Sequence, residues 1–138
     1  MGGGYRLFEH TADVGVLATG DSLKEAYANA ARGLFSVIVD LRGVRDREEH
    51  DVSVAAADQD ALLVAWLNEL IYLFDAQQLL FRWFSVDRLT GTSLTARCYG
   101  ERADPSRHHL KMGVKAATYH MLQVRQNSRC SVRVLLDI

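Results

Sequence analysis

The chain has 138 residues, of which 49% are apolar, and it carries 16 basic and 17 acidic side chains for a formal net charge of −1. This composition is that of one globular domain, residues 1–138, large enough to form its own core. The charge balance excludes the strongly basic surface of non-specific nucleic-acid binders. Any contact with RNA is therefore expected only indirectly, through another protein, or at a small site.

Cysteine usage and hydropathy indicate the compartment. Cys98 and Cys130 are too few for a disulfide framework and have no cysteine or histidine at zinc-like spacing, so we interpret them as buried thiols. The MGGG start leads directly into a strand-like segment with no sign of a signal peptide. The longest apolar segment contains Asn68, Glu69 and Asp75, which argues against a membrane span. These features predict a cytoplasmic protein without a membrane segment.

The first half of the chain predicts three strands and a helix. Alternating apolar residues predict the strands, over residues 5–9, 14–19 and 50–57. The turn HTAD at 10–13 joins the first two. The segment SLKE is a capping box that begins a helix at Ser22, and apolar residues at helical spacing continue it to Ile38. The charge-rich segment 41–49 is expected to be a surface connection.

The second half predicts a long helix and two hairpins. The helix covers residues 61–80 after a cap at Asp58 or Asp60, and its apolar residues surround most of its circumference, as in a central buried helix. Four later segments predict the strands, over residues 81–89, 93–99, 114–125 and 130–136. The segment 101–109, which holds the only proline, predicts a loop.

The order of these elements predicts the fold class. Two strands, a helix, a strand, a helix and four strands favour an α+β fold with two helices packed on a mostly antiparallel β-sheet. We expect Trp66 in the long helix and Trp83 in the next strand to lie in the core rather than to serve as nucleobase platforms.

Polar residues at strand ends are the candidate site residues, because the usual nucleotide-binding, nucleophile-elbow and zinc-protease motifs are absent. Asp13 lies at the mouth of the first hairpin. Asp137 follows the apolar run 132–136, and Ile138 adds a terminal carboxylate. If the last strand pairs near the first, these three residues converge, and clustered oxygens suit Ca²⁺, Mg²⁺ or Mn²⁺. The alternative is that Asp13 caps a turn and Asp137 is a solvated end residue.

Other polar residues allow two interpretations each. His10 and His120 could be general bases or metal ligands, or satisfied structural histidines. Lys115 stands alone in an apolar run, as either an edge-strand gatekeeper or a phosphate-directed charge. We expect Arg107 and His108 to be solvated charges of an exposed loop.

Taken together and in order, these segments resemble the archease family. The matching pieces run from about Tyr5 to the last residue and are FEHTADVG (8–15), ATGDSLKEAY (18–27), LLVAWLNELIYLFD (62–75), GERADPSRH (100–108), VKAATYH (114–120) and VLLDI (134–138). The combination of HTAD, WLNEL and KAxTYH with a chain ending in Asp-Ile is specific.

The resemblance implies an archease-like fold and an accessory protein rather than an enzyme. Archeases assist the RtcB-type RNA ligase, which joins RNA ends in tRNA splicing or RNA repair. They promote guanylylation of the ligase's catalytic histidine and its multiple turnover, and they can broaden the nucleotides it accepts. The RNA is then a partner only indirectly, through the ligase.

The resemblance also implies a site. Family members bind a divalent metal ion, assigned as calcium, at positions that correspond to Asp13, Asp137 and Ile138 here. Lys115 is a further functional candidate by the same match. Gly113 stands where many relatives carry glutamate, which implies weaker metal binding if that carboxylate is a ligand.

In this interpretation Asp13 is a metal ligand, while His10 and Thr11 shape the turn that presents it and His10 supports it indirectly. Two alternatives stay open. One is a free-standing metal-dependent hydrolase that uses both aspartates with His10 or His120. The other is a chaperone-like binding module that needs no metal.

Overall fold

The structure, a computed structural model, describes residues 3–138. Residues 1 and 2, which begin the MGGG segment on which the expectation of no signal peptide depends, lie outside the described residues. The elements are β1 (Tyr5–His10), β2 (Asp13–Gly20), α1 (Leu23–Ile38), a short 3-10 helix (Leu41–Gly43), β3 (Glu48–Ala55), α2 (Gln59–Gln77), β4 (Leu79–Leu89), β5 (Ser93–Arg102), β6 (Ala116–Gln126) and β7 (Cys130–Asp137). Their order confirms the predicted one.

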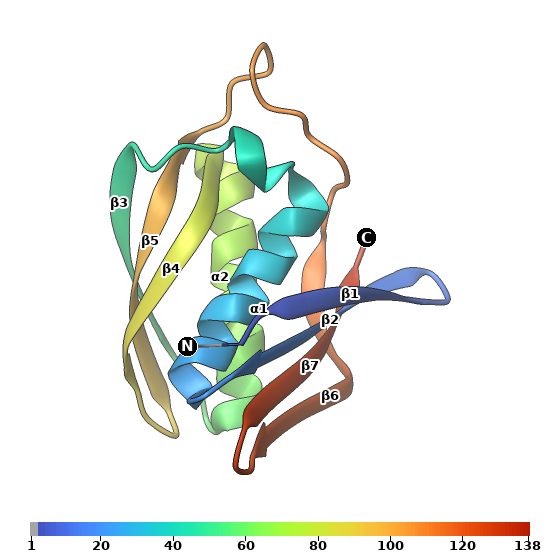
Figure 1. Cartoon of the computed structure of the whole chain (residues 1–138), viewed down its shortest axis with the longest axis vertical. Coiled ribbons are helices and arrows are strands. Elements are labelled where there is room, and N and C mark those ends of the chain that lie inside the picture. Colours follow the sequence, from blue (N-terminus) through green and yellow to red (C-terminus); the bar gives the residue numbers. More distant parts are fainter. Residues whose placement is uncertain (1–2) are drawn as a thin grey trace.

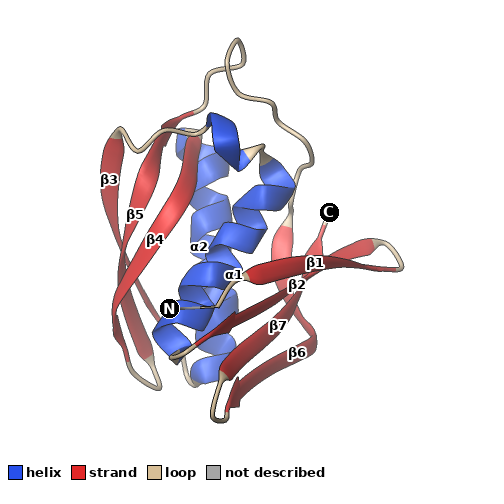
Figure 2. Cartoon of the chain, viewed as in Figure 1, coloured by secondary structure: helices blue, strands red, loops and turns tan. Residues whose placement is uncertain are grey.

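The strands form two sheets with the helices between them. One sheet has the order β1-β2-β7-β6 and the other the order β3-β5-β4, and every strand pair is antiparallel. Figure 1 and Figure 2 show α1 and α2 lying between the two sheets, and α1 contacts strands of both. This confirms an α+β fold with two helices and antiparallel strands. The strands divide into two sheets because the helices between them bury apolar side chains against a sheet on each side of the helical layer.

Helix α1 begins as its capping box predicts. The Ser22 hydroxyl accepts a hydrogen bond from the backbone N–H of Glu25 at 3.2 Å, and the Glu25 carboxylate accepts one from the N–H of Asp21 at 2.7 Å. The helix ends where Val39 becomes extended while its N–H still bonds the Phe35 carbonyl. The sequence therefore predicts both ends of α1 correctly.

Helix α2 ends earlier than predicted. Its start is correct, since the Asp58 carboxylate accepts a hydrogen bond from the N–H of Ala61 at 2.8 Å. Gln78 then takes a left-handed conformation with φ 60°, and the fully buried Leu79 and Leu80 begin β4. No glycine or proline marks the end of the helix, so the sequence contains no clear stop signal there. In the described part of the chain, no helix is long and apolar enough to cross a membrane.

The two tryptophans have different environments. Trp66 is fully buried, and its indole N–H donates to the Tyr27 carbonyl at 3.0 Å, as expected for a core residue. Trp83 is 50% exposed, which contradicts the prediction. The β4–β5 register shifts between Phe81 and Trp83, and this bulge leaves both Arg82 and Trp83 exposed while Phe81 stays buried.

The segment 41–49 is more ordered than a surface connection. This segment contains the short 3-10 helix, which is capped by the Asp40 carboxylate. Val44, which follows that helix, is buried. The cysteines are confirmed as buried free thiols, and burial raises the pKa of the Cys98 thiol above its ordinary value.

Candidate functional site

One row of residues crosses the four-stranded sheet at the end that holds the chain's last strand. His10 of β1 pairs with Asp13 of β2, Asp13 pairs with Asp137 of β7, and Asp137 pairs with Ala116 of β6. Residues directly opposite each other on antiparallel strands point to the same face, with Cβ atoms about 5 Å apart. The structure therefore brings together Asp13 and Asp137, and Ile138 follows directly after them. We call this row with Ile138 the acidic end.

The two aspartates lie on the sheet face away from the helices. The next pair along, Val14 and Leu136, packs into the core, and side chains alternate along a strand. The Asp13 side chain is 28% exposed and Asp137 is exposed. Like charges directly opposite each other destabilise a sheet, and no lysine or arginine among residues 3–138 forms an ion pair with either carboxylate. Their repulsion is left in place.

His10 lies beside the pair without completing a hydrogen bond. Its Nδ1 is 3.8 Å from Oδ2 of Asp13, which is too long for a hydrogen bond, and this buried nitrogen has no other partner. The His10 ring also lies near that of His120, with 5.6 Å between centroids. The structure thus brings both candidate histidines to the acidic end.

A large bulge in β6 places His120 there. Residues 119–122 of β6 oppose a single residue of β7, and Met121 within the bulge has φ 56°. The Met121 carbonyl accepts a hydrogen bond from Nε of Arg133 at 2.9 Å, which fastens the bulge to β7. Bulges of this kind re-aim side chains and are common beside functional sites. No pattern in the sequence predicted this bulge.

Backbone strain gathers at the same end. Thr11, in the β1–β2 turn, has φ 50°, although a β-branched residue is rarely left-handed. In residues 3–138 the other non-glycine residues with positive φ are Met121 and Gln78, so two of the three lie in the turn before Asp13 and next to His120. Such strain costs about 1–2 kcal/mol per residue and clusters at functional sites.

Lys115 and Gly113 precede β6. The Lys115 N–H donates to the Asp137 carbonyl at 2.7 Å, which places an exposed lysine next to the acidic end but just outside the strand. A side chain at Gly113 would meet nothing within 4 Å. The glycine is therefore no steric requirement, and a glutamate would fit there.

The donor set suits a hard cation but does not complete a coordination shell. Among residues 3–138, no cluster of three or more His, Cys, Asp or Glu side chains is placed to hold a metal ion. Ca²⁺ takes about six to eight oxygen ligands, and the acidic end offers the carboxylates of Asp13 and Asp137. The unrelieved repulsion of these carboxylates and the unpartnered Nδ1 of His10 fit a positive charge from outside. Water or a partner protein would supply the remaining ligands.

A second charged cluster was missed by sequence analysis. Glu101 is only 3% exposed, and its carboxylate accepts hydrogen bonds from the Arg107 guanidinium, from Nε2 of His108 at 2.8 Å and from the N–H of Arg45 at 2.8 Å. Nδ1 of His108 accepts from the N–H of Asp104, so the ring proton that Glu101 receives lies on Nε2. The prediction that His108 is solvated is therefore wrong, whereas Arg107 is exposed as predicted but pairs with Glu101. We call this cluster the Glu101 network.

The Glu101 network is electrostatically satisfied. Burial would raise the pKa of Glu101, but the hydrogen bonds from Arg107, Arg45 and His108 lower it to about 2. The network fastens the 101–109 loop to the segment before β3, since Arg107 also donates to the Gly43 carbonyl.

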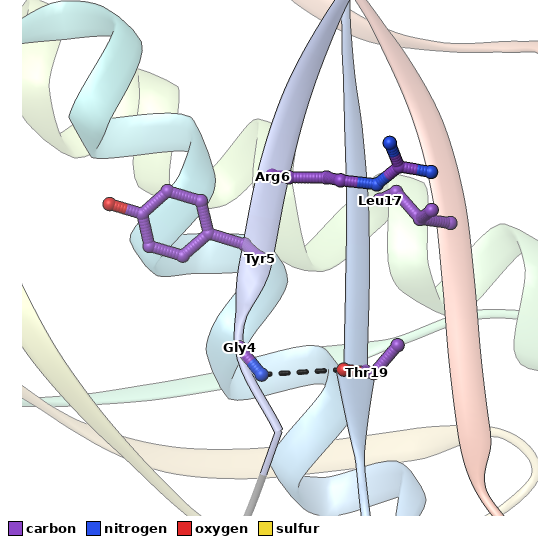
Figure 3. Close-up of a pocket in the computed structure, with 5 residues that line it drawn as sticks. All are labelled: Gly4, Tyr5, Arg6, Leu17 and Thr19. Carbon is purple, nitrogen blue, oxygen red and sulfur yellow. Dashed lines mark hydrogen bonds between the residues drawn. The ribbon is translucent and has the colours of Figure 1, made fainter.

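A shallow hollow of about 250 Å³ lies on the four-stranded sheet near the start of β1. Figure 3 shows Arg6 lying beside Leu17, while Tyr5 points the other way, toward α1, and Gly4 donates to the Thr19 hydroxyl. Arg6 is the one charged residue in its lining, and no acid lies with it. The hollow therefore offers no acid–base pair and is not a candidate catalytic site.

Comparisons with known proteins agree with this fold. The family model described as Archease protein family (MTH1598/TM1083) matches residues 5–138. A protein archease of Pyrococcus abyssi is 41% identical over 136 residues, which cover 95% of this chain and 96% of that protein. The solution structure of Methanobacterium thermoautotrophicum protein 1598 matches with a TM-score of 0.78 and 31% identity, over 98% of this chain and 99% of that one. The crystal structure of an archease, possible chaperone, from Thermotoga maritima has a TM-score of 0.58 and 20% identity over 95% and 94% of the chains, and shows the shared fold alone.

Proposed function

Since this chain belongs to the archease family, we propose that it is an accessory protein of an RtcB-type RNA ligase and acts through its acidic end. It promotes guanylylation of the ligase and its multiple turnover in tRNA splicing or RNA repair. RNA is met through the ligase. This is the role of an activator and not of an enzyme.

The direct pairing of Asp13 with Asp137 is the observation that carries the proposal. Two carboxylates that face each other without a lysine or arginine partner bind a divalent cation more readily than isolated ones, because the cation relieves their repulsion. Asp13 and Asp137, with the carboxyl group of Ile138, hold the ion, and calcium is favoured over magnesium or manganese. When bound, such an ion supplies positive charge for phosphoryl oxygens.

The remaining residues of this end position the aspartates and meet the partner. His10 lies against Asp13 and limits the orientations of its carboxylate. Lys115 presents its exposed ammonium next to Asp137, where it offsets negative charge on a phosphate. The incomplete coordination shell favours a site that is closed by the ligase rather than one that works alone. Docking then shifts the ligase toward the state that accepts the nucleotide.

Ligase guanylylation over many turnovers tests this function. Catalytic traces of wild type, Asp13→Ala and Asp137→Ala are compared, with Asp51→Ala as the matched control, because Asp51 is an exposed carboxylate on the other sheet. We expect stimulation by wild type and by Asp51→Ala, and at least about a tenfold loss for the two acidic-end variants. Equal stimulation by all four proteins, or stimulation that survives chelation of the metal, would show that the acidic end is not the means of activation. Phosphatase or nuclease activity of the isolated protein would favour the hydrolase instead.

A further inference from the structure

Helix α1 lies where the two sheets leave their edges unpaired. β1 is an edge strand of the four-stranded sheet and β4 is an edge strand of the three-stranded sheet. Figure 1 shows α1 between these two strands, and it contacts both. Arg32 of α1 bridges them: its guanidinium carbon lies 5.6 Å from the ring centroid of Tyr5 in β1 and 5.1 Å from that of Trp83 in β4.

The guanidinium of Arg32 contacts two aromatic rings and has no hydrogen-bond partner among residues 3–138. Its central carbon lies within cation–π distance of the rings of Tyr5 and Trp83, and none of its N–H groups donates a hydrogen bond to residues 3–138. Its Nε is buried without a hydrogen-bond partner, and no carboxylate among residues 3–138 pairs with it. An arginine edge has five N–H donors in a fixed fork and no way to lose its charge. It therefore fits an oxyanion that the protein itself does not provide.

Two neighbouring arginines, in contrast, are each paired with a carboxylate of the protein. Arg42 is bound by the Asp40 carboxylate at 2.7 Å, and Arg82 is bound by the Asp46 carboxylate at 3.0 Å. Both line the same hollow as Arg32, but each already has its counter-ion. The uncompensated charge in this hollow therefore belongs to Arg32.

Space is available on both sides of Arg32. A hollow of about 280 Å³ and another of about 400 Å³ lie here, and both are lined by Arg32 and Trp83. Glu25 also lines the larger one, but its carboxylate accepts from the Asp21 N–H and does not pair with Arg32. Small-molecule sites begin at about 300 Å³, so the larger hollow is of sufficient size. Trp83 is 50% exposed, so part of its indole stays open to a further flat group. We call these two hollows the Arg32 cleft.

We propose that the Arg32 cleft binds a nucleoside phosphate, with the phosphate on the guanidinium edge of Arg32 and the base on the exposed surface of Trp83. A planar guanidinium placed between two aromatic rings is preorganised for two parallel hydrogen bonds to a phosphate. An aromatic side chain beside an arginine is also how proteins bind single-stranded nucleic acids without sequence preference. An acidic peptide would pair with Arg32 but would make no stacking contact with the exposed indole of Trp83. The unit bound is either a free nucleotide or one nucleotide of a single-stranded RNA.

This inference is independent of the acidic end. The Arg32 cleft involves α1, β1 and β4, whereas Asp137 lies on β7. It also agrees with the net charge of −1, which excludes a broad basic surface but leaves room for a small site. Binding is measured on the isolated protein, so its failure and a failure of ligase activation are separate results.

Tryptophan fluorescence of the full chain tests the proposal. The chain has two tryptophans, and Trp66 is fully buried, so a ligand that stacks quenches Trp83. The probes are adenosine monophosphate, a single-stranded RNA hexamer, inorganic phosphate and a glutamate-rich peptide. We expect quenching by the first two, and competition without quenching by inorganic phosphate. For the hexamer, log K should fall with log salt with a slope of about −0.7, the value for one phosphate contact.

Variants assign the site. Arg32→Gln and Trp83→Leu should each weaken binding by about tenfold or more, whereas Arg42→Gln, which lines the same hollow but alters an already paired arginine, should change it by less than about twofold. If Arg32→Gln does not fold, Arg32→Lys keeps the charge and loses the planar fork. If the hexamer binds more tightly than adenosine monophosphate, the ligand is single-stranded RNA. If the two bind equally, the ligand is the free nucleotide. No quenching by either, unchanged binding in the Arg32 variants, or tighter binding of the peptide would overturn the proposal.

Discussion

The acidic end and the Glu101 network use carboxylates in opposite ways. Glu101 is buried, but three donors of the protein bind its carboxylate and keep its pKa at about 2. Asp13 and Asp137 are more accessible, yet they face each other, and Nδ1 of His10 stops 3.8 Å short of Asp13. A carboxylate that stabilises the fold, such as Glu101, is surrounded by donors of the protein that compensate its charge. A pair whose repulsion is left in place stabilises nothing by itself and is available to a charge from outside.

The largest effect is expected for Glu101→Ala. The change removes the acceptor of the buried Nε2 of His108 and of the less buried Arg107 guanidinium and Arg45 N–H. Removing one partner of a buried charged network costs about 3 kcal/mol of unfolding free energy, or about 10 °C in Tm. Denaturant unfolding measures it.

The matched control is Asp46→Ala, which removes the exposed partner of Arg82. Exposed ion pairs contribute about 1 kcal/mol or less, so this variant should remain close to wild type. Equal losses for the two variants would mean that burial does not distinguish the Glu101 network from an ordinary surface pair.

Acid should weaken the same network. The pKa of Glu101 is about 2 in the folded protein, below its ordinary value of 4.5, because the donors around it outweigh the effect of burial. Its contribution is therefore complete above about pH 5 and is lost as the pH falls toward 2. Unfolding free energies at pH 6, 4 and 3 should fall more steeply for wild type than for Glu101→Ala.

Asp40 does not confuse this comparison. Hydrogen bonds from Arg42 hold the pKa of Asp40 at about 2 as well, but Asp40 is present in both proteins. Parallel pH profiles would show that the low pKa of Glu101 contributes nothing to folding.

The sequence predicted the acidic end better than the Glu101 network. Asp13 and Asp137 lie at the ends of regular strands with clear alternation, so pairing of β2 with the last strand, β7, was enough to place them together. Glu101 meets Arg107 and His108 because the loop turns back at Asp104, whose carboxylate accepts from the N–H and hydroxyl of Ser106. No periodic pattern encodes such a return, although Asp-Pro-Ser indicates a turn.

Trp83 and the residues around Met121 show the same limit in strands. Each lies beside a bulge, where one or more extra residues end the alternation on which strand predictions depend. The exposed indole of Trp83 and the position of His120 therefore required the structure.

Asp137→Asn should change the unfolding free energy in the opposite direction from Glu101→Ala, which distinguishes the acidic end from the Glu101 network. In a chelator this variant loses only repulsion, so its unfolding free energy should equal or slightly exceed that of wild type. With calcium at one hundred times its Kd, wild type should gain about 2.7 kcal/mol and the variant much less. Thermal unfolding with and without calcium measures both. A loss in chelator as large as that of Glu101→Ala would assign Asp137 a structural role.

The smallest effect concerns backbone strain, and it offers a control inside the chain. Thr11 and Gln78 are both left-handed, with φ 50° and 60°, but Thr11 adjoins Asp13 whereas Gln78 ends α2. Glycine takes this conformation without a steric cost, so Thr11→Gly and Gln78→Gly should each raise the unfolding free energy by about 0.5 kcal/mol.

Their functional effects should differ, because only one of the two strained residues adjoins a proposed ligand. Gln78→Gly should stimulate the ligase as wild type does, since a glycine is the usual residue after a helix end. Thr11→Gly should stimulate less, because a freer turn no longer holds Asp13 opposite Asp137. Guanylylation assays with both variants, alongside their unfolding curves, give the answer. If Thr11→Gly gains stability and keeps full stimulation, the strain at Thr11 does not serve to present Asp13.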